Sequence, residues 1–268
     1  MTNTPLGELI ARGRTADIHA WEDGYVLKLF HNWFELEDIE YEARLARAVQ
    51  ASGLPVPDVG AIVQVNGRNG LVYKRVDGIP MLEVLGRKPE LVFRYARRLA
   101  VLHAQLHAQG FSPEIPPQRR RLENKIRQAT ALPARLQSLA LAALDSLPDG
   151  DRICHGDFHP ANVLLTSQGE VVIDWIDASR GNPLADVART TIITLGAANS
   201  AQISNPVMKA FVRLFHAAYL RQYFKLCPGG EAEYQRWLPI VAAARLSEEI
   251  PEVERWLIAE AQKLEHGS

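Results

Sequence analysis

The residue types that could do chemistry are concentrated in one short part of the chain. Asp157 and Asn162 lie five residues apart in the run 155–164, and Asp174 follows the apolar, β-branched run 171–173. A carboxylate and a carboxamide oxygen are hard ligands of the kind that Mg²⁺ prefers. Phosphoryl transfer needs such ligands on the nucleotide phosphates, together with a carboxylate that orients a hydroxyl and accepts its proton. The pattern therefore predicts phosphoryl transfer, with Asp157 as the catalytic carboxylate and Asn162 and Asp174 as metal ligands.

The same residues carry a resemblance to a known family. Asp157 and Asn162 have the spacing of the Asp and Asn in the protein-kinase catalytic loop. The string H-G-D-F-H-P-A-N-V-L at 155–164, followed by V-I-D-W at 172–175, resembles the aminoglycoside phosphotransferase and choline kinase superfamily of small-molecule kinases. The resemblance covers most of the chain, and residues 153–189 carry its specific part. It implies an α+β, bilobal, protein-kinase-like fold with a small antiparallel-sheet N-terminal lobe and a larger, mainly helical C-terminal lobe.

The resemblance also implies ATP and Mg²⁺ as cofactors and assigns an ion pair. Lys28 is a lone lysine in an apolar strand, and alternation alone would favour a solvent-facing side chain. In the family pattern it becomes the residue that neutralises the α- and β-phosphates. Glu42 becomes its partner, because its Glu-Ala-x-Leu setting fits that pattern. Three neighbouring glutamates compete with it and are interpreted as a solvated helix face: Glu35, Glu37 and Glu40.

Two further segments are predicted to bind the nucleotide through their backbones. Thr15 and Ala16 lie in the turn 13–17, whose N–H groups are expected to cover the phosphates. The turn has one glycine, and an ordinary hairpin turn would have the same geometry. Lys74 and Val76 end the last strand of the small lobe and resemble the family's hinge, where the Lys74 carbonyl and the Val76 N–H would meet the adenine. Because backbone groups make these bonds, the sequence does not separate ATP from GTP.

Four polar residues near the motif are given supporting roles. The resemblance implies that His155 braces the catalytic loop by hydrogen bonds and that Asp186 holds backbone N–H groups of that loop from a helix start. His159 faces either the substrate or metal, or packs within the loop. Asp177 either reaches a second metal through water or has a helix-capping or turn role, and we favour the capping or turn role.

The remaining histidines and cysteines give weaker signals. His103 and His107 lie four residues apart on a predicted helix and match metal-ligand spacing, but no third ligand accompanies them, so a packing role is favoured. Cys154 and Cys227 are the only cysteines, which argues against a disulfide scaffold and fits a reducing cytosol. Cys154 is expected to be a small buried core residue.

Hydrophobic periodicity defines the elements that must position these residues. We expect a nucleotide-binding lobe at 1–78 and a helical catalytic and substrate-binding lobe at 79–268. In the first lobe we predict two strands around a turn within 7–30, a helix at 34–51, and strands at 61–65 and 71–76 joined by a turn at 66–70. In the second lobe we predict strands at 163–166 and 170–174 and helices at 89–108, 119–147 with a break at Pro133, 186–195, 205–225, 231–247 and 251–264.

Composition restricts the function classes. The chain has 268 residues with 30 basic and 31 acidic side chains, so nothing demands nucleic acid or an anionic membrane as a partner. Residues 1–5 show no secretory signal, and no apolar stretch approaches the ~20 residues of a membrane span. We therefore expect a cytoplasmic location. The sequence does not define an oligomeric state.

The acceptor is the least defined part of the prediction. The resemblance implies a small-molecule hydroxyl, and several family substrates are cationic, among them aminoglycosides, choline and ethanolamine. An acidic cluster of four glutamates surrounds Pro251 and either lines a pocket for such a cation or forms a solvated helix start: Glu248, Glu249, Glu252 and Glu254.

Two other functions remain as alternatives. A catalytically weak nucleotide-binding pseudokinase or regulatory protein would keep the fold without turnover. The complete set of motif residues argues against it, whereas the glycine-poor turn and the missing glycine after Trp175 leave it open. A protein kinase is disfavoured, because no Ala-Pro-Glu element lies between Asp174 and Asp186.

Overall fold

The chain folds into two compact units that interleave in sequence. The structure is a computed structural model that describes residues 6–13, 15–110 and 114–266. One unit comprises Met1–Pro80 and Val163–Ile176, and the other comprises Met81–Asn162 and Asp177–Ser268. The predicted lobes were each one continuous segment divided at residue 78, whereas contacts group residues 163–176 with the N-terminal segment. The functional assignment of the two lobes stays a prediction.

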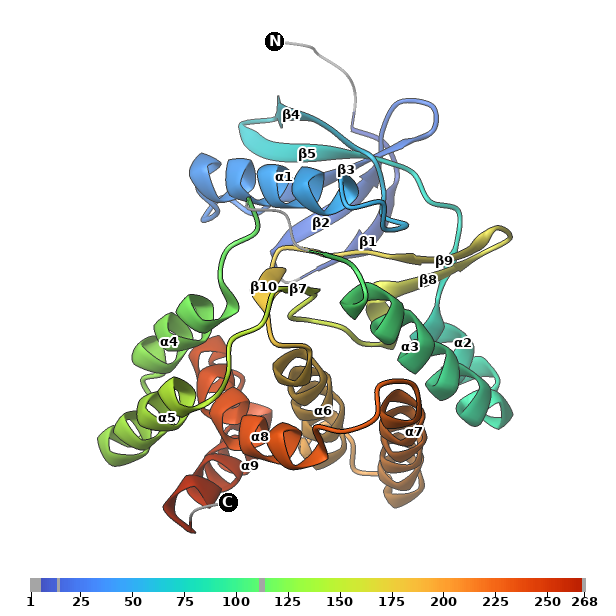
Figure 1. Cartoon of the computed structure of the whole chain (residues 1–268). Helices are drawn as coiled ribbons and strands as arrows, with labels where there is room; N and C mark the ends of the chain where they lie inside the picture. The colour runs from blue at the N-terminus through green and yellow to red at the C-terminus, as the bar shows by residue number, and fades with distance from the viewer. Residues whose placement is uncertain (1–5, 14, 111–113, 267–268) are drawn as a thin grey trace. The chain divides into compact units, whose positions relative to one another are not determined.

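The first unit contains an antiparallel sheet of five strands in the order β1-β2-β3-β5-β4 (Figure 1). The strands are β1 Leu9–Arg12, β2 Ala16–Ala20, β3 Tyr25–Phe30, β4 Val59–Val65 and β5 Arg68–Lys74. Helix α1, Leu36–Gln50, packs on the sheet, with Ile39 and Ala43 buried against Phe30 and Leu71. The sequence prediction missed β1. All four of its residues are exposed, so it has no alternating pattern to detect.

The turn between β4 and β5 is shorter than the predicted turn at 66–70. Asn66 and Gly67 both have left-handed backbones, with φ of 50° and 79°, as a two-residue hairpin of type I′ requires. Arg68 already pairs with Val65 in the ladder. Gly70, which the prediction placed in the turn, lies inside β5 instead. A Cβ there would come within 2.6 Å of the Leu27 side chain, so this glycine permits close packing.

A second small sheet carries the segment before Asp174. Its strands are β6 Ile79–Pro80, β8 Val163–Thr166 and β9 Gly169–Val172, in the order β6-β8-β9. The strand predicted to run to residue 174 therefore ends at Val172. Asp174 follows with a φ of 65°, a left-handed conformation that is rare outside glycine but that Asp and Asn tolerate better than other residues.

The second unit is mainly helical (Figure 1). Its helices are α2 Met81–Arg87, α3 Val92–His107, α4 Gln118–Gln128, α5 Ala134–Ser146, α6 Pro183–Asn199, α7 Pro206–Leu226, α8 Glu231–Arg245 and α9 Pro251–Ala261. The predicted break at Pro133 lies between α4 and α5. Two short strands, β7 Arg152–Cys154 and β10 Ser179–Gly181, pair antiparallel and were not predicted. Three residues are too few to show a hydrophobic period.

Helix α6 begins earlier than predicted because of its capping sequence. The Asn182 side chain accepts a hydrogen bond from Leu184 N at 2.9 Å, and Pro183 occupies the first helical position. The prediction began the helix at residue 186 and did not interpret this Asn-Pro pair as its cap. Helix α6 packs against α7 and α8, and α3 packs against α7, so the core of this unit surrounds α6 and α7. Among the described residues, no helix combines the length and apolar character needed to cross a membrane.

Candidate active site

The loop that carries Asp157 is held at its base by Asp186. Backbone N–H groups of His155 and Gly156 donate to the two carboxylate oxygens of Asp186, at 2.7 and 2.8 Å. This confirms the role predicted for Asp186 at the start of α6. Gly156 has a φ of 79°, and a Cβ there would lie 2.3 Å from the Asp177 carbonyl oxygen, so the loop requires glycine.

The Asp157 carboxylate lies among donors that keep it ionised. Asn162 Nδ2 donates to Oδ2 of Asp157 at 3.0 Å and to its carbonyl at 2.9 Å. His159 Nε2 lies 3.3 Å from Oδ2, and Arg189 Nη2 lies 3.7 Å from Oδ1. Burial alone would raise the pKa of Asp157, but the hydrogen bond from His159 and the charge of Arg189 hold that pKa well below its usual range. Because the amide nitrogen of Asn162 faces Asp157, its amide oxygen is the atom that could bind a metal.

The two loop histidines both bond within the loop. His155 is fully buried, and its Nδ1 accepts from Asp157 N at 3.1 Å, which confirms the predicted bracing role. His159 Nδ1 accepts from Ala161 N at 3.3 Å, and its Nε2 faces Asp157 Oδ2 at 3.3 Å. Of the two roles left open for His159, the structure therefore supports the one within the loop.

Arg189 is a site residue that the sequence prediction missed. Its Nε donates to the Gly156 carbonyl at 2.9 Å, and its Nη2 lies 2.6 Å from Glu248 Oε1 as well as near Asp157. One signal was present, because Arg189 follows Asp186 by three residues and therefore shares a face of α6 with it. Asp186 and Arg189 together fix the loop from one helix.

His103 and His107 belong to the network around Asp186. Their Nε2 atoms lie 3.0 and 3.2 Å from Asp186 Oδ2, and their Nδ1 atoms each lie 2.7 Å from a tyrosine hydroxyl, of Tyr219 and Tyr223. The expectation that no third metal ligand accompanies the pair was wrong, since Asp186 completes such a cluster. Rings that donate through Nε2 and accept through Nδ1 pair with the carboxylate and the two tyrosine hydroxyls by hydrogen bonds, which supports the predicted packing role.

Buried neutral histidines predict a loss of stability in mild acid. Burial lowers the pKa of His103 to about 3 and that of His216 to about 4. Between these values and about 6.5, the unfolded chain binds protons that the folded chain does not, so the free energy of unfolding falls as the pH falls. We expect His216→Gln to reduce this slope by about 1 kcal/mol per pH unit near pH 5.

The measurement is urea unfolding at pH 4.5 to 7.0. His266→Gln is the matched control, because His266 is exposed, and it should leave the slope unchanged. An equal slope in wild type and His216→Gln would mean that His216 does not resist protonation in the folded protein.

In the first unit, Lys28 lies between two carboxylates. Its Nζ is 2.7 Å from Glu42 Oε1 and 3.4 Å from Asp174 Oδ1, which confirms the predicted Lys28–Glu42 pair. The side chain of Lys28 is 13% exposed, so it does not face solvent as alternation alone suggested. Burial alone would lower the pKa of Lys28, but Asp174 and Glu42 raise it. Tyr73 also donates to Glu42 Oε1, at 2.9 Å. The three competing glutamates are all exposed: Glu35, Glu37 and Glu40.

Both predicted nucleotide-binding segments differ from their predicted bounds, and their nucleotide contacts stay predictions. Ala16 and Asp17 belong to β2 rather than to the turn, and the strand predicted to run to residue 76 ends at Lys74. Gly13 N donates to Ala16 O at 2.9 Å and closes the turn between β1 and β2, and His31 N donates to Thr15 O at 3.0 Å. Arg14, in the same predicted turn, lies outside the described residues. Lys74 is the last residue of β5, and Val76 follows beyond the strand. The structure thus brings Lys28, Glu42 and Asp174 together in one unit, and Asp157 and Asn162 together in the other.

The predicted acidic cluster is not one surface. Glu248 lies among cations, 2.6 Å from Arg189, 3.4 Å from Arg245 and 3.6 Å from Lys125. Glu249 accepts from Thr130 and Glu252 from Gln202, both at exposed positions. Asp177 lies in a turn, as favoured from sequence, and it also pairs with two cations, Arg121 and Lys125.

Comparison with known proteins identifies the family. The profile of the phosphotransferase enzyme family matches residues 9–240, which is most of the chain. The chain belongs to this family. A search for relatives among curated proteins found no match. The family assignment confirms the resemblance drawn from the 155–164 motif.

Solved structures with the same fold include several small-molecule kinases. A choline/ethanolamine kinase family protein from Mesorhizobium loti is 17% identical, with a TM-score of 0.60 over 97% of this chain and 87% of that one. An aminoglycoside-3'-phosphotransferase of type VIII is 22% identical, with a TM-score of 0.60 over 93% and 94%. Amicoumacin kinase in complex with AMP-PNP and Ca²⁺ is 16% identical, with a TM-score of 0.58 over 97% and 88%. These likenesses confirm the predicted α+β, protein-kinase-like fold.

Proposed function

We propose that this phosphotransferase is an ATP- and Mg²⁺-dependent kinase that phosphorylates a hydroxyl of a small molecule. The observation that carries the proposal is the position of Lys28, buried between Glu42 and Asp174. One carboxylate holds this lysine in place, and a second carboxylate, which is the proposed metal ligand, lies within 4 Å of it. A lysine in this setting is arranged to receive a polyphosphate. Family membership and the AMP-PNP complex of amicoumacin kinase support a nucleotide as the donor.

On the nucleotide side, Lys28 would neutralise the α- and β-phosphates as a point charge with three donors. Glu42, which also accepts from Tyr73, would keep the ammonium group in place. Backbone groups of Thr15 and Ala16 would cover the phosphates, and those of Lys74 and Val76 would bind the base. These contacts are the part of the proposal that rests on family pattern.

The donor set proposed for the metal fits Mg²⁺. Asp174 offers a carboxylate that is 42% exposed, and Asn162 offers an amide oxygen whose nitrogen is already engaged with Asp157. Both are oxygen donors, and no thiolate or imidazole ligand accompanies them in the proposal, as a hard cation requires. When bound, Mg²⁺ would screen the charge that develops on the transferred phosphoryl group.

Asp157 would accept a hydrogen bond from the acceptor hydroxyl and orient its oxygen for attack. Its low pKa means that it is ionised at neutral pH and can receive the proton as the new bond forms. Asn162 and Arg189 would hold the carboxylate in one orientation. Asp186 would hold the loop backbone. The proposed proton acceptor, Asp157, and the residues that position it therefore all belong to the second unit.

Asp174→Asn tests the metal part of the proposal. Asparagine tolerates the left-handed backbone at this position but removes the charge, so the fold should survive. We expect the affinity for AMP-PNP in the presence of Mg²⁺ to fall by about tenfold or more, because a charged ligand contributes about 1.5–3 kcal/mol. Isothermal titration calorimetry measures this change.

The control is Asp23→Asn, an exposed aspartate in the turn before β3 of the same unit. It should bind AMP-PNP like the wild type. Equal affinity in Asp174→Asn and wild type would remove Asp174 from the metal site. Nucleotide binding without ADP release on any hydroxylated compound would favour the regulatory alternative.

A further inference from the structure

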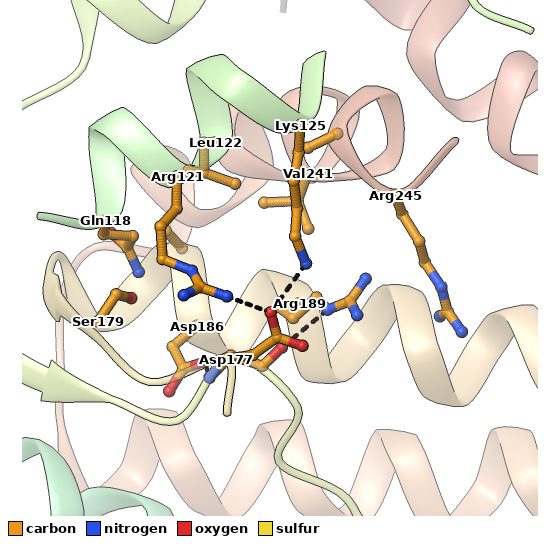
Figure 2. A pocket seen from close by; sticks show the side chains of 13 residues that line it. Gln118, Arg121, Leu122, Lys125, Asp177, Ser179, Asp186, Arg189, Val241 and Arg245 are labelled. Carbon is orange, nitrogen blue, oxygen red and sulfur yellow. Dashed lines mark hydrogen bonds and ion pairs between the residues drawn. The ribbon is translucent and has the colours of Figure 1, made fainter. Parts of the chain in front are cut away.

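A small cavity in the second unit is lined by cations and adjoins the proposed catalytic carboxylate. Its volume is about 50 Å³. Four basic side chains reach it from three helices, Arg121 and Lys125 from α4, Arg189 from α6 and Arg245 from α8 (Figure 2). Gly156, the residue before Asp157, also lines it, and Arg189 Nη2 is 3.7 Å from Asp157 Oδ1. A group bound in the cavity would therefore lie close to the residue that orients the hydroxyl.

The carboxylates in and around the cavity are already shared between cations. Asp177 Oδ1 accepts from both Arg121 and Lys125, as Figure 2 shows. Glu248 lies within ion-pair distance of three cations: Lys125, Arg189 and Arg245. Asp186 also lines the cavity, but its oxygens accept from loop N–H groups and lie near two histidines. An ammonium group would have to compete for every one of these carboxylates. The cavity lining itself holds four cations and two carboxylates, Asp177 and Asp186, and so favours an anion, while Glu248 and Asp157 at its edge bring the surroundings to four charges of each sign.

Arg245 provides unsatisfied donors for such an anion. Its side chain is 11% exposed, and its Nε and Nη1 atoms are buried without a hydrogen-bond partner among the described residues. Glu248 Oε2 lies 3.4 Å from Nε, as an ion-pair contact. Burial and repulsion by Arg189 lower the pKa of Arg245 to about 10. Buried donors are normally paired, so these two nitrogens point to a missing acceptor.

The size of the cavity limits what it can hold. A volume of 50 Å³ accommodates about three or four waters, which is the size of one carboxylate or phosphate group rather than of a sugar ring. Arginine binds both groups through paired N–H donors. We infer that this cavity binds an anionic group of the acceptor, so that the substrate is a hydroxy acid or a phosphorylated alcohol. This assignment rests on the proposed function, and it replaces the cationic acceptor that the family resemblance suggested.

Direct binding of inorganic phosphate tests the cavity without turnover. The titration is performed calorimetrically with AMP-PNP and Mg²⁺ present, so that the nucleotide site is occupied. We expect phosphate to bind the wild-type protein, and Arg245→Gln and Lys125→Gln each to weaken binding by about tenfold. Lys125→Gln is included because Lys125 is less buried than Arg245 and its loss is less disruptive to folding.

The matched control is Arg127→Gln, on the same helix as Arg121 and Lys125. Arg127 is 58% exposed, pairs with Glu123 and does not line the cavity, so phosphate affinity should not change. The inference is overturned if wild type does not bind phosphate, or if Arg127→Gln weakens binding as much as the two cavity variants. If the wild-type protein does not bind AMP-PNP, that result would instead contradict the proposed function.

A panel of acceptors identifies which anion is used. Each compound presents a hydroxyl with a different second group. Glycerate adds a carboxylate and glycerol 3-phosphate a phosphate, whereas glycerol is uncharged and ethanolamine carries a cation. We expect ADP release with kcat/KM at least about tenfold higher for one of the two anions than for glycerol or ethanolamine, and this preference should fall in Arg245→Gln. Turnover confined to glycerol or ethanolamine would overturn the inference while leaving the proposed kinase function intact.

Discussion

Replacing Asp157 by asparagine is expected to lower kcat by ~10²–10⁴, the range for loss of a group that accepts a proton in the transition state. The affinity for Mg²⁺ and AMP-PNP should stay within about threefold of wild type, because Asp157 is proposed to act on the hydroxyl and not on the nucleotide. Asparagine keeps the size of the side chain and can still accept from Asn162 Nδ2, whose contact at 3.0 Å fixes the present orientation. The measurement is steady-state ADP release with an acceptor found in the panel above.

The pH dependence of kcat provides a second readout for Asp157. Because its pKa is held well below the usual range, the carboxylate remains ionised as the pH falls from 8 to about 5. Wild-type kcat should therefore show no loss that is due to Asp157 from pH 8 to about 6.5, above the range in which the buried histidines weaken the fold. Asp145→Asn, at an exposed site on α5 of the same unit, should retain full activity. Near-normal kcat in Asp157→Asn would exclude Asp157 as the catalytic carboxylate.

The sequence was sufficient where a function depends on residues close together in the chain. Asp157 and Asn162 are five apart, and one short loop brings their side chains into contact. The predicted turn at 66–70 was correct in place but too long. Two glycines could each belong to the turn, and the contact that places Gly70 in the strand instead is with Leu27, which lies far away in the sequence. Strand β1 was missed because an exposed edge strand carries no hydrophobic alternation.

Sequence reasoning was weakest where charges from distant segments meet. The four glutamates around Pro251 looked like an acidic pocket because only their neighbours in sequence were visible. In the structure, Glu248 faces Lys125, Arg189 and Arg245, which come from three different helices. Net charge in a cavity is a sum over residues that only the fold assembles, and no local pattern reports it. For that reason the sequence suggested a cationic acceptor, whereas the inference drawn from the cavity is an anionic one.

The Lys28–Glu42 pair shows how a resemblance and a structure support one another. Local alternation favoured an exposed lysine, and only the family pattern placed Lys28 opposite Glu42. The contact at 2.7 Å confirms the pairing, while the phosphate-binding role stays a prediction. The choice of Glu42 over Glu40 is decided by burial, because Glu42 is 4% exposed in its side chain and Glu40 faces solvent.

A double-mutant cycle on this pair is expected to be strongly non-additive. Lys28→Ala should lower kcat/KM by ~10²–10³, the range for loss of one preorganised electrostatic donor. Glu42→Ala alone should cost about tenfold, because Lys28 would keep Asp174 as a partner at 3.4 Å and lose its correct position. If Glu42 acts only through Lys28, the double variant should fall within about threefold of Lys28→Ala. The measurement is kcat/KM with one acceptor held fixed.

Two control variants separate the pair from its surroundings. Tyr73→Phe removes the other hydrogen bond to Glu42 Oε1 and leaves the Lys28 contact intact, so it should change kcat/KM by less than about threefold. Glu40→Ala removes an exposed carboxylate from the same helix and should have no effect. Additive losses in Lys28→Ala and Glu42→Ala would mean that Glu42 supports turnover independently of the lysine. A severe loss in Tyr73→Phe would place the critical contact of Glu42 at the tyrosine hydroxyl, because the buried carboxylate would then depend on that donor for its position.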